Sequence, residues 1–321
     1  MRSRSVRHLL LLAALASVTA LGVVVDLRAE ETTPAIVEHI GGDIKVVHVR
    51  GSVYALFGAG AAVVVSIGED GVLVVDTGAA TQTEKIVAII RQLSKREIRW
   101  ILNTTLDADH IGGNEKLSLA GRTVNGNPAA IIAHEKLPLR MVKLPTPVPI
   151  SARPLNTFFS ESRDFFFNGD AVFVYHTTGH TDGDTIVHFR NSDVIAAGDT
   201  FATTTYPVID LANGGSVQGF IDGLNRILDL TVPKHLEEGG TYVVPGHGRI
   251  SDEADVLEYH DMIVIVRDRI RDAIKKGQTL DQVKAARLTR DYDARYAASS
   301  GPATTASFVE SVYRDLSRAA K

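Results

Sequence analysis

Short apolar runs rich in β-branched residues alternate with glycine-containing turns in the first third of the chain beyond residue 40. Runs of this length and composition are typical of β-strands. They predict strands at 43–49, 52–57, 61–67, 71–76 and 98–103. Before the last of these strands the apolar period changes to that of a helix, at Ile86, Ile89, Ile90 and Leu93. This period predicts a helix over 81–94, which we expect to begin with a capping box of Thr81 and Glu84.

The second half of the chain follows the same order, with strands first and helices afterwards. Strands are predicted at 171–176, 184–189, 193–197 and 241–245. Helices are predicted at 216–230 with Ser216 as cap, at 251–276, at 279–288 with a Thr279–Gln282 capping box, and at 304–319. Two successive groups of strands and helices indicate two sheets packed together with helices outside. No repeat or composition shift divides residues 30–321, which we expect to form one domain.

The amino terminus resembles an export signal. Three arginines precede an apolar run at 9–25, and small residues at Ala16, Ala20 and Ala29 offer cleavage points. We therefore predict a signal peptide at 1–29 and a periplasmic or secreted protein. The alternative is an uncleaved membrane anchor, because the apolar run is near the lower limit for a membrane span. Without that anchor, no stable membrane insertion is expected.

The amino-acid composition limits the metal ligands, nucleophiles and partners that are possible. The chain has 321 residues, a formal net charge of −4, no cysteine and eleven histidines. Without cysteine there are no disulfides, thiolate ligands or thiol nucleophiles, so any metal must be held by nitrogen and oxygen. No long basic run is present, and nucleic acid is not an expected partner because phosphate neutralisation needs clustered Lys and Arg.

Polar side chains are concentrated directly after the predicted strand 98–103, at Thr105, Asp107, Asp109 and His110. In an extended segment the first three would point the same way, because side chains alternate along a strand. Such a cluster at a strand end can hold a cation. The alternative is an Asx-rich turn that caps the following helix.

Three distant segments resemble this one in being strand ends where glycine stands beside His or Asp. Residues 177–184 contain His180 and Asp184, residues 197–200 contain Asp199, and residues 245–248 contain His247. Glycine permits close backbone approach and leaves a neighbouring ligand side chain exposed. Convergence of these strand ends on one metal site explains the pattern better than separate local hydrogen bonds do.

In this order, the four segments resemble the motifs of the metallo-β-lactamase superfamily over residues 40–250. The family motifs are H-x-H-x-D-H-x-G-G, a G-H-T-x-G-D segment, a G-D segment and P-G-H-G. The chain as a whole resembles exported, glyoxalase II-like members, and the stretch 206–230 resembles exported members found near sulfur-oxidation and quinoprotein systems. The resemblance implies an α+β fold, the four-layer αβ/βα metallo-β-lactamase sandwich, with metals at one edge of the two sheets.

The resemblance also implies roles for individual residues. Asp109, His110 and His247 match the ligands of the second metal position, and Asp199 matches the carboxylate that bridges two metals. His180 matches the third ligand of the first metal position. The sequence departs from the family where two histidines of that position are replaced, by Thr105 and Asp107. Threonine is a weak neutral ligand, and aspartate is a harder, shorter, negative one.

The implied function is a metal-dependent hydrolase that uses metal-activated water on a small-molecule ester, thioester, lactone or lactam. Zinc is the expected cofactor, with one or two ions per chain, and manganese or iron could suit the altered position. Asp107 and Asp109 are the candidate catalytic residues, and Asp199 is a further candidate proton acceptor. Thr105, Asp184 and Tyr206 are expected beside the metals or in the pocket. Asp184, together with Thr181, would contact His180.

The alternative function is a non-catalytic relative that keeps the fold and binds a ligand or partner protein. The altered first position favours this alternative, whereas the complete second position favours the hydrolase. Specificity is expected from loops near 140–165 and 200–215. Histidines elsewhere are interpreted as structural, namely His39, His48, His188 and His260, with His134 and His176 as structural or adjacent to the site.

Overall fold

The computed structural model describes residues 34–319, apart from 38–39, 41, 145–147 and 237–238. The predicted signal peptide at 1–29 and His39 lie outside these residues. None of the helices in the described ranges combines the length and hydropathy that a membrane crossing requires.

The first sheet has eight strands in sequence order. These are β1 (Ala35–Ile36), β2 (Lys45–Arg50), β3 (Val53–Phe57), β4 (Val63–Gly68), β5 (Gly71–Val75), β6 (Ile98–Leu102), β7 (Ala130–His134) and β8 (Asn156–Phe158). Pairing is antiparallel from β1 to β5 and parallel from β5 to β8. The carboxyl ends of β5, β6 and β7 therefore meet at one edge.

The second sheet has five strands in the order β13-β12-β11-β10-β9. These are β9 (Ser162–Phe167), β10 (Asp170–Thr177), β11 (Asp184–Phe189), β12 (Val194–Ala202) and β13 (Tyr242–His247). Only β12 and β13 are parallel neighbours. This pairing places Asp199, on β12, beside the carboxyl end of β13.

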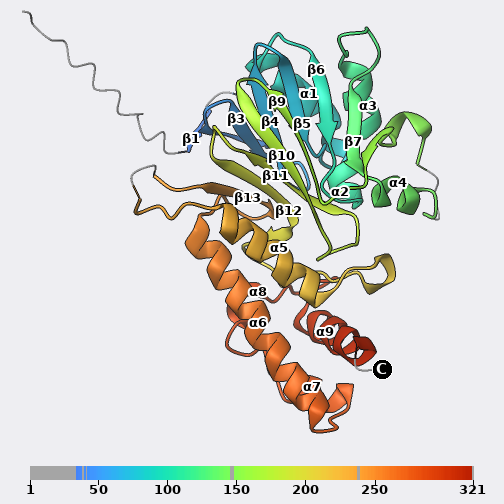
Figure 1. Cartoon of the computed structure of the whole chain (residues 1–321), viewed down its shortest axis with the longest axis vertical. Coiled ribbons are helices and arrows are strands. Elements are labelled where there is room, and N and C mark those ends of the chain that lie inside the picture. Colours follow the sequence, from blue (N-terminus) through green and yellow to red (C-terminus); the bar gives the residue numbers. More distant parts are fainter. Residues whose placement is uncertain (1–33, 38–39, 41, 145–147, 237–238, 320–321) are drawn as a thin grey trace, which may run out of the picture. The chain divides into compact units, whose positions relative to one another are not determined.

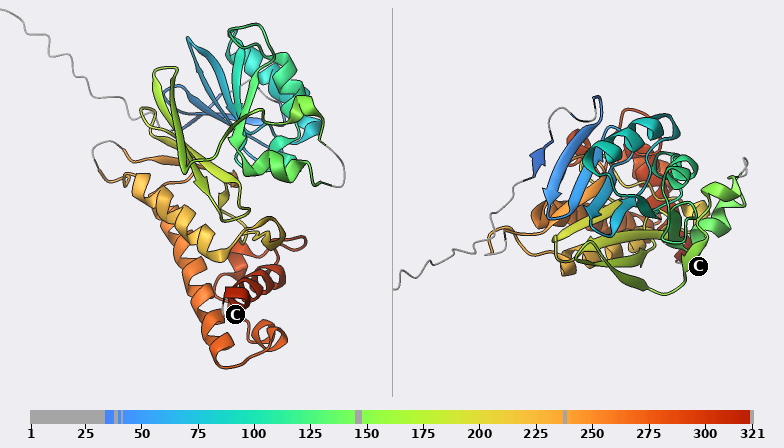
Figure 2. Two further views of the ribbon diagram at one scale, coloured as in Figure 1. Left: turned by 45° about the vertical axis from the view of Figure 1, so that its right-hand side comes forward. Right: turned by 90° about the horizontal axis from the view of Figure 1, so that it is seen from above.

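Helices cover the outer face of each sheet (Figures 1 and 2). Helix α1 (Thr83–Leu93) and α3 (Asn114–Ala120) pack on the first sheet, and α5 (Val217–Leu230) and α6 (Glu253–Lys275) pack on the second. A separate apolar core, which includes Val64, Leu102, Phe189 and Val244, lies between the sheets. The predicted four-layer α+β sandwich is confirmed.

The remaining helices and turns connect the strands or follow α6. Helix α2 (Ala108–Ile111) and α4 (Lys136–Met141) follow β6 and β7, and 3₁₀ turns lie at Ala80–Gln82, Ile150–Ala152 and Leu211–Asn213. Helices α7 (Leu280–Ala285), α8 (Asp293–Tyr296) and α9 (Thr305–Ala319) follow α6, and α9 packs against α6 and α7. Buried aromatic rings join these helices to the second sheet: Tyr206, Tyr259, Tyr296 and Phe308.

Two of the three predicted helix caps are present in the structure, and one is not. The Ser216 hydroxyl accepts from the Gly219 backbone N–H, and the Thr279–Gln282 capping box is present. The Thr81–Glu84 capping box was wrong. The chain already turns at Ala80, so Thr81 lies inside a 3₁₀ turn, and α1 has no side-chain cap.

Four strands, β1, β7, β8 and β9, were not predicted from the sequence. β1 has only two residues, and β7, β8 and β9 occupy ranges without a clear apolar alternation. β8 and the start of β9 fall within the segment 140–165 that was expected to be a specificity loop. β8 lies at the edge of its sheet and has only three residues, two of them exposed. Short edge strands of this kind are defined by pairing with a neighbour and leave little trace in a local sequence pattern.

Candidate metal centre

Four strand ends bring the predicted ligands together. Asp107 precedes α2, and Asp109 and His110 lie on it, directly beyond β6. His180 follows β10, Asp199 is in β12, and His247 ends β13. The six side chains form two groups, each with ligand atoms within 4.8 Å of one another. One group contains Asp109, His110 and His247, and the other contains Asp107, His180 and Asp199.

Asp199 lies between the two groups. Its Oδ1 is 3.1 Å from His110 Nε2 and 3.5 Å from His247 Nε2, whereas its Oδ2 is 4.0 Å from His180 Nε2. The two oxygens of one carboxylate thus face different groups. This is the arrangement that a bridging ligand between two metal positions requires.

A glycine in the neighbouring strand makes this placement of Asp199 possible. A Cβ atom added to Gly246 would lie 2.6 Å from Asp199 Oδ1 and 2.8 Å from the backbone carbonyl of Gly198. Both contacts are too short for real atoms. Any larger residue at position 246 would therefore displace Asp199 or separate β12 from β13.

Two buried imidazole nitrogens indicate that these residues fit a metal ion. His110 Nε2 and His180 Nε2 are buried and have no hydrogen-bond partner in the described part of the chain. The short approach of Asp199 to His110 lacks hydrogen-bond geometry. A buried polar atom without a partner costs about 1–3 kcal/mol. Coordination of a divalent cation by the imidazoles and the adjoining carboxylates would satisfy both atoms.

The orientation of His110 depends on Asp76, which was not among the residues predicted for the site. Asp76 Oδ2 accepts from His110 Nδ1 at 2.8 Å, and its Oδ1 accepts from the Thr104 backbone N–H at 2.8 Å. Asp76 has a φ of 59°, a left-handed conformation that aspartate tolerates better than most residues. A sequence signal was available, because Asp76-Thr77-Gly78 follows strand β5 as the other carboxylate-glycine segments follow theirs.

His180 is held in a different way from the predicted one. Its Nδ1 donates to the backbone oxygen of Val208 at 2.9 Å. Asp184, expected as its partner, instead accepts from the Thr181 backbone N–H at 2.6 Å and from the Thr181 hydroxyl at 2.5 Å. Asp184 therefore fixes the turn that carries His180 and makes no hydrogen bond to its ring.

The electrostatics of the cluster follow from buried carboxylates beside buried imidazoles. Burial lowers the pKa of His180, but the Asp107 carboxylate, 3.3 Å from its Nε2, and the charges of Asp184 and Asp199 outweigh it and raise that pKa to about 10. Burial likewise opposes protonation of His110, but the charges of Asp199 and Asp76 raise its pKa well above the usual value. The negative charge that produces these shifts also favours a divalent cation.

The motif segment is not extended as predicted. Thr105 is fully buried, and its hydroxyl has no partner among the described residues. Asp107 faces His180 at 3.3 Å, whereas Asp109 faces His247 at 3.3 Å. The three side chains differ in direction because the backbone enters α2 after Asp107, which ends the strand-like alternation.

Tyr206 does not line the pocket mouth, so that prediction was wrong. Its ring is fully buried and stacks on Phe308, and its hydroxyl donates to Asp293 Oδ1 at 2.9 Å. It belongs to the core beneath the last helices. A polar residue on an irregular segment looks exposed in sequence, and only the later packing of α8 and α9 covers this one.

The other histidines near the motif form a stack. The rings of His134 and His176 lie 3.8 Å apart and nearly parallel, and His176 Nε2 lies 2.8 Å from the backbone oxygen of Asp182. Burial, then repulsion by His176 and Lys136, lowers the pKa of His134 to about 4. Neither ring belongs to the two ligand groups.

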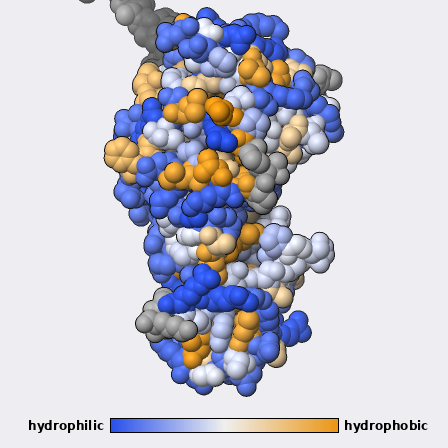
Figure 3. All heavy atoms as spheres, turned by 90° about the vertical axis from the view of Figure 1, so that its right-hand side faces the viewer, coloured by the Kyte–Doolittle hydropathy of each residue, from blue (hydrophilic) through white to orange (hydrophobic). Residues whose placement is uncertain are grey.

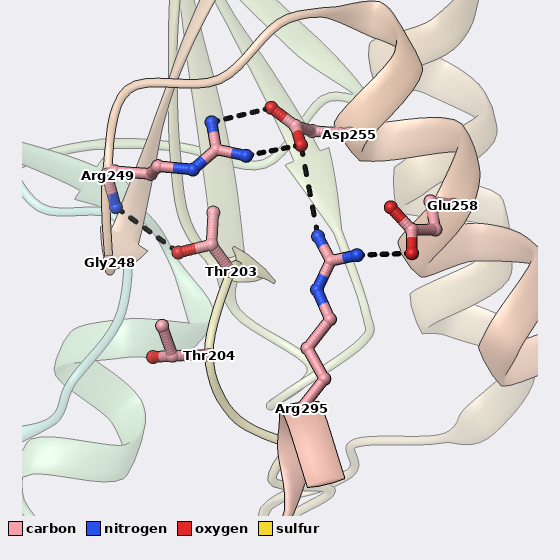
Figure 4. Close-up of a pocket in the computed structure, with 7 residues that line it drawn as sticks. All are labelled: Thr203, Thr204, Gly248, Arg249, Asp255, Glu258 and Arg295. Atoms are coloured by element: carbon pink, nitrogen blue, oxygen red, sulfur yellow. Dashed lines mark hydrogen bonds and ion pairs between the residues drawn. The ribbon is translucent and has the colours of Figure 1, made fainter. Parts of the chain in front are cut away.

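A polar pocket adjoins the cluster at the end of β13 (Figure 4). The Thr203 backbone N–H donates to the His247 oxygen at 3.2 Å, and the Thr203 hydroxyl accepts from the Arg249 N–H at 3.2 Å. The cavity measures about 640 Å³. Its walls are formed by Thr203, Thr204, Gly248, Arg249, Asp255, Glu258 and Arg295.

Sequence comparison agrees with this fold and site. The family model of the metallo-β-lactamase superfamily matches residues 55–249, which include all six candidate ligands. The chain belongs to this superfamily, whose members are generally metal-dependent hydrolases. A search of curated protein sequences finds no match.

Solved structures with this fold come from several kinds of protein. The inverting sec-alkylsulfatase Pisa1 from Pseudomonas sp. superposes with a TM-score of 0.61 at 14% identity, over 84% of this chain and 49% of that one. The chain thus spans about half the length of the alkylsulfatase. A metallo-β-lactamase from Pontibacter korlensis gives 0.51 at 16% identity, over 72% and 99% of the two chains.

Another solved structure is described by a sequence motif. A metallo-β-lactamase with a HARLDQ motif from Cronobacter sakazakii gives a TM-score of 0.52 at 17% identity, over 71% of this chain and 88% of that one. At such identities these likenesses establish the fold alone.

Proposed function

We propose that this protein is a metal-dependent hydrolase that cleaves an ester, thioester, lactone or lactam in a small molecule. The observation that carries the proposal is the convergence of Asp199 with five other His and Asp side chains, with two buried imidazole nitrogens that have no hydrogen-bond partner among the described residues. Asp109, His110 and His247 would hold one ion, Asp107 and His180 would hold a second, and Asp199 would contact both. Zinc suits the first set, and manganese or iron also suits the second.

A bound divalent ion would lower the pKa of a water molecule towards about 7 and polarise the bond to be cleaved. The chain itself supplies orientation and proton transfer. Asp76 and the Val208 carbonyl fix the rings of His110 and His180, which limits their ligand atoms to Nε2. Asp107 and Asp109 are part-exposed carboxylates at the surface of the cluster. They are therefore placed to accept a proton from the attacking water.

The polar pocket beside His247 is a candidate binding site for part of the substrate. Arg249 forms a bidentate ion pair with Asp255, at 2.6 and 2.8 Å, and Arg295 pairs with Glu258. The wall is polar and its charges are balanced by one another. We infer that this pocket receives a polar, hydrogen-bonding part of the substrate rather than an alkyl chain.

Hydrolysis and metal content should be measured on the same protein preparations. The substrate panel consists of an aryl ester, a thioester, a lactone and a β-lactam, with an alkyl sulfate added because one fold relative is a sec-alkylsulfatase. We expect hydrolysis of at least one member, loss of that activity on chelation and its return with metal. His247→Ala should lose metal and activity, whereas His260→Ala, a matched change on α6, should keep both. Activity that survives chelation would contradict the proposal.

The alternative, a non-catalytic relative, is less well supported. It would explain the replacement of two histidines by Thr105 and Asp107, but it gives no reason for the second metal position to keep every ligand type. Metal binding without hydrolysis of any panel member, in a protein that is folded by circular dichroism, would favour this alternative.

We also propose that the protein is exported, on the basis of its arginine-rich start and apolar run at 9–25. Mass spectrometry of the native protein should find a mature amino terminus between Ser17 and Glu30. An intact Met1 in a soluble cytosolic fraction would show that the segment is not a signal peptide.

A further inference from the structure

A second and larger cavity lies at the opposite end of the first sheet. It measures about 940 Å³ and is bordered by the amino-terminal ends of β6, β7 and β8, by the end of β9 and by the segment after α3. The candidate ligands follow the carboxyl end of β6. A five-residue strand spans about 16 Å, so a molecule bound in this cavity would be separate from the metal centre.

The walls of this cavity are mostly apolar and unusually exposed. Leu119 is 52% exposed, Val124 86%, Ile150 70%, Leu155 74% and Phe166 69%. Trp100 also lines the cavity. The face drawn in Figure 3, the side of Figure 1 on which α3 and β7 lie, carries apolar patches among hydrophilic residues. Concave apolar surface of this size is typical of ligand sites.

Two arginines add positive charge to this apolar cavity. Arg99 Nη1 donates to the Arg122 backbone oxygen at 2.7 Å, and its Nε is buried without a partner among the described residues. Arg153 Nε donates to the Val148 backbone oxygen at 2.8 Å. Both bonds are to neutral carbonyls, and in the described part of the chain neither guanidinium has a carboxylate within 4 Å. Their charges are therefore not neutralised by the protein.

One carboxylate, Asp70, also borders the cavity. Its Oδ2 accepts from the Asn168 backbone N–H at 2.7 Å, so it is engaged in joining the β4–β5 turn to the β9–β10 turn. The cavity thus keeps a net positive charge on an apolar surface. In the polar pocket beside His247, by contrast, each arginine forms an ion pair with a carboxylate.

We propose that this cavity binds a single-chain amphiphile with an anionic head group, of which a medium-chain carboxylate is the simplest example. The head group would contact Arg99 and Arg153, which offer several N–H donors in the planar arrangement that matches a carboxylate. The hydrocarbon chain would cover Trp100, Leu119 and Phe166. Each CH₂ group that it removes from water should strengthen binding about fourfold, so affinity should increase with chain length.

The composition of the chain supplies a direct probe, because Trp100 is its single tryptophan. Decanoate, titrated below its micelle concentration, should shift the tryptophan emission to shorter wavelength with saturation. Octanoate should bind about tenfold or more weakly, and acetate should have no effect. Decyltrimethylammonium, with the same chain and the opposite charge, should bind at least tenfold more weakly than decanoate.

Variants test whether the named residues are responsible. The double change Arg99→Gln and Arg153→Gln should weaken decanoate binding at least tenfold, and Leu119→Asp, at an exposed position, should do the same. Arg290→Gln, which removes one charge at an exposed arginine outside the cavity, should leave decanoate binding unchanged. Circular dichroism verifies that each variant is folded.

Three results would overturn the proposal. The first is an emission spectrum that stays constant up to the micelle concentration. The second is equal binding of the anionic and cationic amphiphiles. The third is an emission shift that depends on protein concentration and coincides with a dimer in sedimentation analysis, which would mean that the apolar surface joins two copies of the chain.

Discussion

The altered first metal position gives the sharpest prediction. Its candidate ligand atoms are His180 Nε2, Asp107 Oδ2, which lies 3.3 Å from that nitrogen, and Asp199 Oδ2, which lies 4.0 Å from it. Asp107 is 43% exposed on its side chain, so water competes for it, and the buried Thr105 hydroxyl is a weak neutral donor. We expect this position to hold zinc weakly, and the wild-type protein to retain nearer one zinc than two after dialysis.

Replacing Thr105 and Asp107 with histidine should restore strong metal-ligand atoms at this position. The double variant Thr105→His and Asp107→His is expected to retain nearly two zinc ions per chain. If free zinc exceeds the dissociation constant of the restored site 100-fold, binding adds about 2.7 kcal/mol to stability. For a chain of this size that corresponds to a rise in melting temperature of roughly 5 °C, and only when zinc is present.

Elemental analysis of the two proteins, dialysed side by side, is the deciding assay, with calorimetric melting curves measured with and without zinc. Thr105→Val serves as the matched control, because losing a feeble hydroxyl should leave the zinc content unchanged. Two full equivalents in the wild type would show that Asp107 replaces a histidine adequately. A folded double variant that still holds one zinc would refute the assignment of these positions to the site.

Three further predictions concern residues around the site. Gly246→Ala should lower zinc content, because the added Cβ would meet Asp199 Oδ1 at 2.6 Å; unchanged zinc would mean that the strands separate without cost. Asp76→Asn should weaken zinc binding about 10–100-fold in competition titrations while the fold is retained, because His110 loses its charged partner; equal affinity would assign Asp76 a purely structural role. The lowered pKa of His134, about 4 against 6.5, means that the unfolded chain takes up this proton first as the pH falls, so the contribution of His134 to stability is fully present above pH 6.5 and about 1–3 kcal/mol of it is lost towards pH 4. In urea unfolding, His134→Phe should lose less stability over this range than the wild type, and parallel losses would exclude this histidine as the cause.

Much of the fold could be predicted because its signals are local. Strands β2 to β6 and β10 to β13, and helices α5, α6, α7 and α9, lie close to the ranges expected from apolar periodicity and capping residues. A strand with one or two buried faces must repeat apolar residues at a fixed period, and a helix end must satisfy its free N–H groups, so both leave marks in the sequence. The same locality made the ligand-bearing segments recognisable as strand ends beside glycine.

Which side chains meet was decided by the tertiary structure. The sequence contained Asp107, Asp109 and Asp199, but only the start of α2 and the pairing of β12 with β13 place the first two in different groups with the third between them. Asp76 reaches His110 across 34 positions, a contact that no local period encodes.

Burial on irregular segments was likewise invisible in the sequence. Tyr206 lies on a segment without regular structure, and it is covered by helices that come some 90 residues later in the chain. The edge strands β8 and β9 exist because a neighbouring strand offers them hydrogen bonds. The sequence by itself determined most of the elements and the residue types available for chemistry. Only the packing of the two sheets decided distances, partners and exposure, because those depend on chain segments far apart in sequence.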